Sequence, residues 1–449
     1  CSSSSSVVDI ASASDVKRGN FQDRGKVLMT TKKLQWQPLT LPANRLSMDT
    51  QKLFCKSNDP LNHTSADVGK FFQLDGSTNV FADLFYHTGF CAGEKHMRQL
   101  RTTASMVRQA GLNLRDELFQ LRQSGTLSEH AGFIVSGERG CGKSSTLDYV
   151  LAACQQADWL VVCIPSATEW NLGLGSRNAQ APHEAYRVTD TKLFKEIPPQ
   201  LADSPLYESP DVTTNMLIAT YLSQRTKLEK IQIQDPERRA HYAHVASNPA
   251  VGPTLADMLA QVVEDSYDSF ADFPVPLRPV FDFLSELQSV TQFPVLLVVD
   301  NWNSWHHMTS TSAWKQPKVP LHAQQMLVPS ILGSLDGYGR RMANGVMVCG
   351  ITFSGAVPPM LPRTMRKYWP PPPNWRHIQS LDHNLQEALR PVPAYSMLEL
   401  QRCLEFYAHI GHIQNQGLRA QLSSGELCNK VSLMTSNCAE DVFKLCDAM

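Results

Sequence analysis

Residues 132–145 read Gly-Phe-Ile-Val-Ser-Gly-Glu-Arg-Gly-Cys-Gly-Lys-Ser-Ser, and this stretch decides the fold of the chain. It contains a short apolar run, a glycine-rich loop and the beginning of a helix-like stretch, Lys143 to Gln156. From Gly137 to Ser144 the residues match the pattern G-x-x-x-x-G-K-[ST] at every fixed position. A strand, a loop of this pattern and a helix in that order are typical of a phosphate-binding loop.

The residue types in this loop suit the binding of a nucleotide. Glycines permit backbone conformations and close approaches that a Cβ atom would obstruct, so successive amide N–H groups can surround a phosphate at a helix N-terminus. Lys143 adds a positive charge toward the outer phosphates, the Ser144 hydroxyl can help to hold Mg²⁺, and Ser145 can reach an inner phosphate. A coincidental glycine-rich turn is the alternative interpretation. We predict a nucleotide site formed by Gly137, Glu138, Arg139, Gly140, Cys141, Gly142, Lys143, Ser144 and Ser145.

A second acidic element supports this prediction. The apolar run Val295 to Val299 ends in Asp300, which is the position from which a carboxylate can hold Mg²⁺, usually through a water. A buried strand that ends in a capping aspartate is the alternative. We predict that Ser144 and Asp300 form the metal site, with Asp300 acting through a water. His306-His307 and His409 to His412 have metal-like spacing but lack a third ligand nearby, so we do not expect zinc.

The residue after Asp300 bears on turnover. Hydrolytic NTPases of the AAA and STAND type usually place a glutamate there, whereas this chain has Asn301, and an amide cannot act as a general base. We therefore predict no catalytic residue and little hydrolysis. Thr352 and Ser354 could lie near a γ-phosphate or be ordinary strand-end residues. The guanine-reading pattern N-K-x-D is absent, so the residues leave both ATP and GTP open.

Other apolar runs predict the architecture. Residues 159–164, 295–299 and 346–351 are uniformly apolar, as in strands buried on both faces of a parallel sheet. Helical spacing of apolar residues predicts a long amphipathic helix from Lys95 to Gln123. We predict an α/β fold of the P-loop NTPase class, AAA/STAND-like, with a parallel sheet flanked by helices. The expected parts are an N-terminal extension at 1–68, partly flexible, a nucleotide-binding domain at 69–390 with an insertion at about 165–255, and a C-terminal helical domain at 391–449.

Composition limits the classes of function. The 449 residues are 42% hydrophobic and 18% charged, as in a folded globular chain. Basic and acidic residues number 41 and 42, a net charge of -1, which provides no global positive field for a nucleic acid. The 11 cysteines include no C-x-x-C pair, so we expect reduced thiols rather than a disulfide framework. The sequence contains no run of eighteen apolar residues, so it predicts no membrane-spanning segment.

Two local regions could still contact RNA. Residues 1–60 hold nine Lys or Arg against five Asp, which suits an arm lying on RNA or a partner protein, or a solvated extension. Arg363, Arg366 and Lys367 adjoin Tyr368 and Trp369, a basic and aromatic patch that could contact RNA or be a solvated loop. The following Pro370 to Pro373 predicts an extended loop with polyproline character.

Several segments together resemble a known family, the death-associated protein three family of mitochondrial small ribosomal subunit proteins (small-subunit protein S twenty-nine). The resemblance runs from about Gly69 to the C-terminus, and the first 68 residues and parts of 165–255 do not match well. The segments that carry it are Arg101 to Arg108, Ser136 to Ser144, Asp158 to Leu160 with Ile164-Pro165, Val298 to Asn303, Val392 to Ser396 and Cys403 to Tyr407.

The resemblance implies properties that the residues alone do not give. It implies a P-loop fold of the AAA or STAND kind, a bound guanine nucleotide, GTP or GDP, and a place in the head of the mitochondrial small subunit near the subunit interface. The implied partners are small-subunit ribosomal RNA, neighbouring mitochondrial ribosomal proteins and large-subunit bridge components, and the implied location is the mitochondrial matrix. An association with apoptosis in animals is implied as well, but it belongs to signalling and not to the site.

Three hypotheses about function follow. We favour a structural ribosomal protein that binds guanine nucleotide and Mg²⁺ with little or no turnover. The alternative is a P-loop ATPase that remodels a partner or acts as a switch, and this alternative requires a group that activates water. A third hypothesis is an interaction module that works without nucleotide and keeps the loop as a relic.

Overall fold

The computed structural model describes one compact unit within Asn44–Met449. Thr352, Ser354, the basic and aromatic patch at 363–369 and Pro370 to Pro373 lie outside the described residues, as do residues 1–49. The described residues are 50–74, 84, 87–88, 91, 102–172, 184–187, 206–208, 210–268, 278–306, 308–313, 316–335, 341–351 and 387–448.

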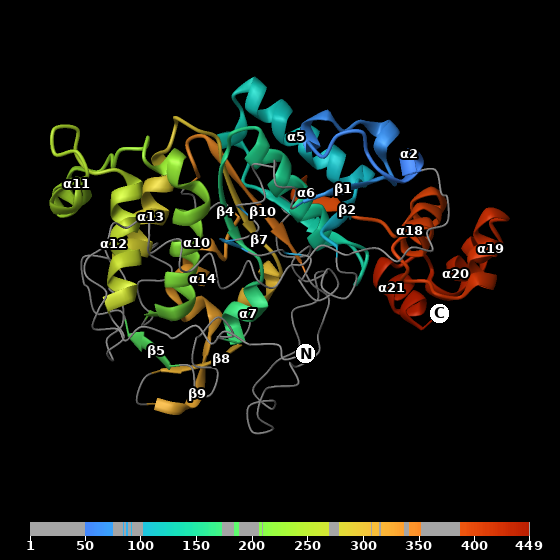
Figure 1. Cartoon of the computed structure of the whole chain (residues 1–449). Helices are drawn as coiled ribbons and strands as arrows, with labels where there is room; N and C mark the ends of the chain where they lie inside the picture. The colour runs from blue at the N-terminus through green and yellow to red at the C-terminus, as the bar shows by residue number, and fades with distance from the viewer. Residues whose placement is uncertain are drawn as a thin grey trace, which may run out of the picture. The chain divides into compact units, whose positions relative to one another are not determined.

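A five-stranded parallel sheet forms the centre of the described fold (Figure 1). Its spatial order is β11, β3, β10, β7 and β4, and every neighbouring pair is parallel. Every strand except the edge strand β11 is buried along its whole length. Burial on both faces of a strand explains why the sequences of these strands are apolar. The predicted parallel sheet is confirmed. The strand bounds are β3 Phe133–Ser136, β4 Leu160–Ile164, β7 Val295–Val299, β10 Gly345–Gly350 and β11 Leu389–Pro391.

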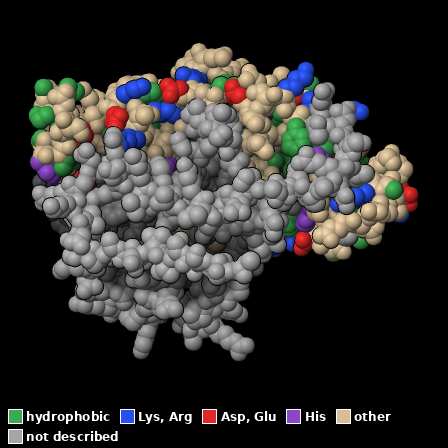
Figure 2. Space-filling view, in the orientation of Figure 1, with side chains coloured by type: hydrophobic (Ala, Val, Ile, Leu, Met, Phe, Trp, Pro, Cys, Tyr) green, Lys and Arg blue, Asp and Glu red, His purple; other side chains and the backbone are tan. Residues whose placement is uncertain are grey.

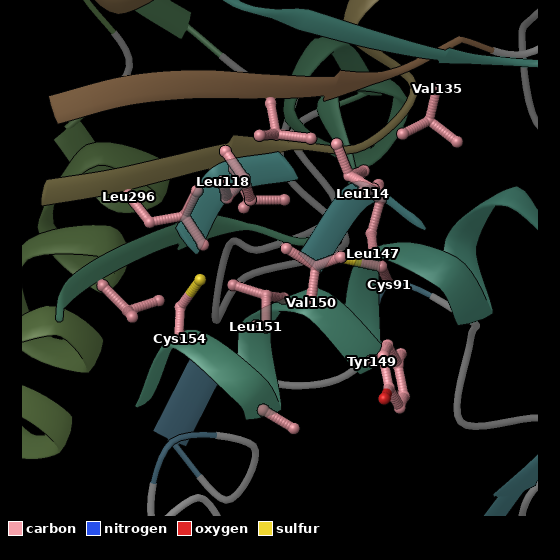
Figure 3. Packing of buried hydrophobic residues seen from close by; sticks show 14 of the residues in the cluster. Cys91, Leu114, Leu118, Val135, Leu147, Tyr149, Val150, Leu151, Cys154 and Leu296 are labelled. Atoms are coloured by element: carbon pink, nitrogen blue, oxygen red, sulfur yellow. The ribbon is translucent and has the colours of Figure 1, made fainter. Parts of the chain in front are cut away.

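Helices cover both faces of this sheet. On one face, α6 (Lys143–Gln156) and α5 (Gln109–Ser124) pack on alternate strand residues. Figure 3 shows this packing, in which each fully buried aliphatic side chain contributes about 1.5–3 kcal/mol. On the other face, α13 (Arg278–Ser289) and α14 (Leu327–Leu332) lie against β7 and β10. The side chains of the first face include Leu114, Leu118, Val135, Leu147, Val150, Leu151, Cys154 and Leu296.

The long helix predicted from Lys95 to Gln123 is wrong at its beginning. Ala104–Met106 forms strand β2, which pairs antiparallel with β1 (Phe71–Gln73), and α5 starts only at Gln109. Met106 is buried against the C-terminal helices rather than along a helix face. Tertiary packing therefore overrides the helical spacing of the apolar residues at this point.

The connection between β4 and β7 contains additional helices and strands. Besides α13, the described α-helices of this connection are α7 (Ala167–Leu172), α10 (Pro210–Leu228), α11 (Pro236–His241) and α12 (Leu255–Asp268), and α10 packs on β4. A four-stranded sheet that the sequence did not predict has the order β6, β5, β8, β9, and only β5 and β6 belong to this connection, because β8 and β9 follow β7. Its strands are β5 Glu184–Arg187, β6 Tyr207–Glu208, β8 Met308–Ala313 and β9 Gln316–His322.

The C-terminal segment forms helices, as predicted. Its described residues contain α18 (Met397–His409), α19 (Gln416–Ser423), α20 (Glu426–Thr435) and α21 (Ala439–Asp447). These helices share a hydrophobic cluster with Phe71 and Met106, and the short helix α2 (Thr50–Leu53) packs on α18. The predicted domain boundaries stay predictions. Short 3-10 helices are Pro60–Asn62, Ser65–Asp67, Leu127–Glu129, Ala243–Val245, Trp302–His306 and Ala323–Gln325.

The described surface carries mixed charge. Figure 2 shows basic and acidic side chains interspersed along the described part of one face, in keeping with the net charge of -1. Among the helices that the structure describes, none has the length and apolarity needed to cross a bilayer.

Candidate nucleotide site

The candidate site lies at the carboxyl edge of the parallel sheet. The glycine-rich loop follows β3, Asp300 follows β7, and β10 lies between these two strands. Because the strands are parallel, their carboxyl ends meet at one edge, which is where ligands bind in open α/β sheets. A Cβ atom at Gly350, the last residue of β10, would collide with Asp300 Oδ1. The fold therefore brings the loop and the predicted acidic residue together.

The loop glycines Gly137, Gly140 and Gly142 all have positive φ angles, and the last two show most clearly why glycine is required. Gly140 has φ +75°, and a Cβ atom there would lie 2.5 Å from the Cβ atom of Glu440. Gly142 has φ +99° and is the N-cap of α6. L-residues with a side chain rarely adopt such conformations, so the sequence G-x-G-K at 140–143 turns the chain sharply into the helix. The amide groups at the start of α6 consequently lie at a helix N-terminus, which favours anions.

Lys143 is the first residue of α6, and its side chain is buried across the loop. Its Nζ atom donates hydrogen bonds to the carbonyl oxygens of Gly137 (3.0 Å) and Glu138 (2.7 Å). Burial lowers the pKa of Lys143, because taking an ammonium group out of water disfavours its charge. A phosphate at the loop would supply an opposite charge and offset that cost.

Ser144 and Asp300 form a direct contact. The Ser144 hydroxyl donates to Asp300 Oδ2 at 2.6 Å, and the Asn301 backbone N–H donates to Asp300 Oδ1 at 2.8 Å. Burial raises the pKa of Asp300 to about 6, although the Ser144 hydrogen bond, the Asn301 amide and the Lys143 charge act in the opposite direction. A carboxyl with a raised pKa beside a lysine in a phosphate-binding pattern is typical of a functional site.

The donor atoms of this pair fit Mg²⁺. A hydroxyl and a carboxylate are hard oxygen ligands, and Mg²⁺ is commonly held by one or two protein oxygens together with phosphate oxygens and waters. No group of three or more His, Cys, Asp or Glu side chains that could hold a metal occurs in the described part of the chain. The predicted metal role of Ser144 and Asp300 requires a bound phosphate and stays a prediction.

The remaining loop residues face different surroundings. Glu138 and Arg139 are exposed, and Arg139 pairs with Glu440 at 3.6 Å. Cys141 is buried, and burial raises the pKa of its thiol, so the reactive thiolate is disfavoured. Ser145 is half-buried within α6, and its predicted contact with an inner phosphate stays a prediction.

Asn301 has a backbone role that the sequence did not reveal. Its φ angle is +56°, in the left-handed region that asparagine tolerates better than most residues with a side chain. Its carbonyl oxygen accepts a hydrogen bond from Ser304 N at 2.8 Å. This turn ends β7 and presents the Asn301 amide to the Asp300 carboxylate.

Arg108 is the main residue beside the loop that the sequence analysis missed. This buried side chain donates to the carbonyl oxygen of Cys141 and, through Nη2, to that of Pro393 at 2.8 Å. Its Nε atom lies 3.1 Å from Oε1 of Glu399, and the guanidinium lies over the ring of Tyr395. The segments 101–108 and 392–396 both carry the family resemblance, and this was the available signal. The spacing of residues along the sequence does not predict the contacts between these two segments.

Comparisons with known proteins identify a family. A family model described as mitochondrial ribosomal death-associated protein 3 matches residues 105–187 and 191–440, which include the loop and Asp300. The small ribosomal subunit protein mS29 of Bos taurus is 26% identical over 113 residues. That alignment covers 25% of this chain and 27% of the relative, so the chain matches about a quarter of the relative's length.

Proposed function

Because this chain belongs to the mitochondrial ribosomal death-associated protein 3 family, we propose that it is a structural component of the mitochondrial small ribosomal subunit. The name of the bovine relative, a small ribosomal subunit protein, supports this proposal. The proposed partners are small-subunit ribosomal RNA, neighbouring ribosomal proteins and large-subunit bridge components. The proposed location is the mitochondrial matrix.

We further propose that the chain has a P-loop NTPase fold and binds GTP or GDP with Mg²⁺. One observation carries this proposal: the loop of pattern G-x-x-x-x-G-K-S leads into α6 directly beside the Ser144–Asp300 hydrogen bond. The sheet order supports it, since β10 lies between β3 and β7 and places the loop and Asp300 on either side of one strand end. The choice of guanine comes from the family resemblance, and the residues themselves leave ATP open.

Little or no turnover is part of the proposal. Asn301 occupies the position at which a glutamate would polarise water, and an amide cannot accept the proton. The competing function is an ATPase that remodels a partner or acts as a switch. Phosphate release at roughly one per second or faster under multiple turnover would favour the competing function, because that rate is within the usual range of enzymes.

Bound nucleotide would stabilise the folded chain. A ligand that binds only the native state stabilises it by RT ln(1 + [L]/Kd), roughly 4 kcal/mol at a thousandfold excess over Kd. The nucleotide would then act as a structural ligand that orders the loop and the elements around it.

The test compares Lys143→Ala with the matched control Lys430→Ala, whose side chain is half-exposed on α20. Removing the buried charge should weaken GDP–Mg²⁺ binding by about tenfold or more, since hydrogen bonds to charged groups contribute about 1.5–3 kcal/mol. The measurements are nucleotide recovered from denatured protein and co-sedimentation with small-subunit RNA through a high-salt gradient. If Lys143→Ala keeps the nucleotide content of the natural chain and still co-sediments with small-subunit RNA, the proposed nucleotide site is wrong.

A further inference from the structure

The carbonyl oxygens of a phosphate-binding loop need donors of their own. When successive N–H groups converge on a phosphate, the carbonyl groups of the same peptides point away from it. Buried carbonyl groups are almost always hydrogen-bonded, so the loop needs donors for these groups. Lys143 Nζ, at the start of α6, is the donor for the carbonyl oxygens of Gly137 and Glu138. The donors for Arg139, Gly140 and Cys141 come from segments far away in the sequence.

The N-cap residue and the first turn of α21 supply one of these donors each. Glu440 N donates to the Gly140 carbonyl oxygen at 3.0 Å, and Cys438 Sγ donates to that of Arg139 at 3.3 Å. The N–H groups in the first turn of a helix have no partner within the helix, so the Glu440 N–H is available to the loop. The Arg139–Glu440 ion pair at 3.6 Å adds a side-chain contact at the same place.

The third donor connects the loop to α18. Arg108 donates to the carbonyl oxygen of Cys141 and pairs with Glu399. Glu399 also accepts a hydrogen bond from Ser396 N at 2.8 Å and thereby closes the capping box of α18. Since α18 and α21 share one hydrophobic cluster, the back of the loop is attached to the C-terminal helices at two points.

We propose that the first turn of α21 is a positioning element of the phosphate loop, which couples nucleotide binding to the packing of the C-terminal helices. This inference rests on the proposed nucleotide site and assigns Glu440, through its backbone N–H, to the support of that site. By thermodynamic linkage, any factor that displaces α21 weakens nucleotide binding, and nucleotide stabilises α21 by the same factor.

A proline substitution removes the relevant N–H group together with the Glu440 carboxylate, which pairs with Arg139 and Lys444. Glu440→Ala, which removes the carboxylate and keeps the N–H group, is therefore measured beside it. Glu440→Pro removes the donor to Gly140 and places a ring carbon where the hydrogen was, while proline is tolerated in the first turn of a helix. Ala439→Pro is the matched control, because it places the same residue one position earlier in α21. Cys438 precedes it with φ -68° and ψ 122°, the extended conformation that favours a following proline.

The measurement is the affinity of the full chain for GDP with Mg²⁺, by titration calorimetry, together with the melting temperature without nucleotide. We expect Glu440→Pro to bind about tenfold more weakly than Ala439→Pro, the equivalent of roughly one hydrogen bond plus displacement of the loop. The two variants should melt within a few degrees of each other. A role in stability alone would move the melting temperature and leave the affinity unchanged.

The outcomes separate the two proposals. Equal affinity of Glu440→Pro and Ala439→Pro, with GDP binding intact in the natural chain, would overturn the coupling alone. Failure of the natural chain to bind GDP or ATP with Mg²⁺, with no effect of Lys143→Ala, would overturn the nucleotide site itself.

Hydrogen exchange in the natural chain keeps the inference testable if Glu440→Pro does not fold. GDP should slow exchange at residues 438–442 more than in α12, a helix that packs on α10. Equal or absent protection of these two segments would overturn the coupling.

Discussion

The charged residues on the two sides of the phosphate loop differ in how they are paired. We call the side with Lys143 and Asp300 the front of the loop, and the side with Arg108 and Glu399 its back. On the front, burial shifts the pKa values of Lys143 and Asp300 toward neutrality, downward for the lysine and upward for the aspartate. On the back, Arg108 is matched to the Glu399 carboxylate and to the carbonyl oxygens of Cys141 and Pro393. Burial therefore disfavours the charged forms of the groups on the front, whereas the charged groups on the back are paired with each other.

This difference predicts opposite effects of mutation. Replacing a group on the back should lower stability, since its partners would be left buried without a hydrogen bond. Replacing the Asp300 carboxylate on the front should lower affinity while stability is kept or improved, because functional sites commonly retain groups that cost folding energy. The following predictions test this contrast, from the largest effect to the smallest.

Arg108→Met should give the largest loss of stability. It removes the guanidinium and leaves the Glu399 carboxylate, which has only 6% of its side chain exposed, without its charged partner. Breaking a buried ion pair by removing one partner typically costs about 3–5 kcal/mol. Urea unfolding of the chain without nucleotide measures the free energy of unfolding.

The double variant Arg108→Met with Glu399→Gln is the control for this prediction. Removing both charges should recover part of the loss, because no buried charge is left unpaired. A loss below about 1 kcal/mol in Arg108→Met would contradict a structural role for the back of the loop.

Asp300→Asn should have the opposite effect on stability. The pKa of this carboxyl is raised from 3.8 to about 6, so between these pH values the folded chain binds more protons than the unfolded chain. Stability of the natural chain without ligand should therefore fall as pH rises from about 4 to 6 and then level off. The variant should lose this slope and be more stable at pH 7 by up to roughly 3 kcal/mol, while its affinity for GDP–Mg²⁺ decreases.

Urea unfolding at several pH values between 4 and 7 checks this contribution. The matched control is Asp116→Asn, which neutralises a carboxyl that is 62% exposed on α5. This control should keep the decline in stability from pH 4 to 6. Persistence of the full decline in Asp300→Asn would show that Asp300 is not its source.

Gly350→Ala should cost an intermediate amount. A Cβ atom there would collide with Asp300 Oδ1 and lie 2.9 Å from Leu147 Cδ1. Overpacking of this kind typically costs about 1–3 kcal/mol. Denaturant unfolding measures the loss, and it should shrink when Gly350→Ala is combined with Asp300→Ala, which removes one side of the collision. A loss unchanged in the double variant would mean that the Asp300 carboxylate does not lie against β10.

The front of the site could be predicted because its signals are local. Uniform apolar composition identifies β3, β7 and β10 as buried strands, and parallel strands bring their carboxyl ends to one edge. The loop pattern then places Lys143 and Ser144 at the start of a helix, and Asp300 follows the end of a strand. Each inference needed only a few consecutive residues.

The back of the site could not be predicted, because its contacts join residues far apart in sequence. Arg108 reaches Pro393 and Glu399, and Gly140 reaches Glu440, and no periodic pattern encodes such pairs. The edge strand β11 was also missed, since its three residues include an arginine and a proline, with two of them half-buried and Pro391 exposed. Edge strands of this kind lack the continuous apolar composition that identifies central strands.

Asn301 provides the smallest expected effect and the sharpest test of turnover. Its φ angle of +56° should make Asn301→Ala less stable than Asn301→Gly by about 1 kcal/mol, because a Cβ atom is unfavourable in the left-handed region. Denaturant unfolding of the two variants measures this difference. Equal stabilities would mean that residue 301 does not keep this conformation.

The same geometry bears on whether a glutamate at this position would create a hydrolase. Asn301→Glu supplies a carboxylate, but the left-handed backbone directs the side chain differently from an ordinary strand-end residue and costs about 1 kcal/mol. A general base must lie within hydrogen-bond reach of the attacking water. We therefore expect phosphate release by Asn301→Glu to stay far below one per second. Rapid release would show that only the missing carboxylate, and not the backbone around Asp300, holds this chain in a binding role.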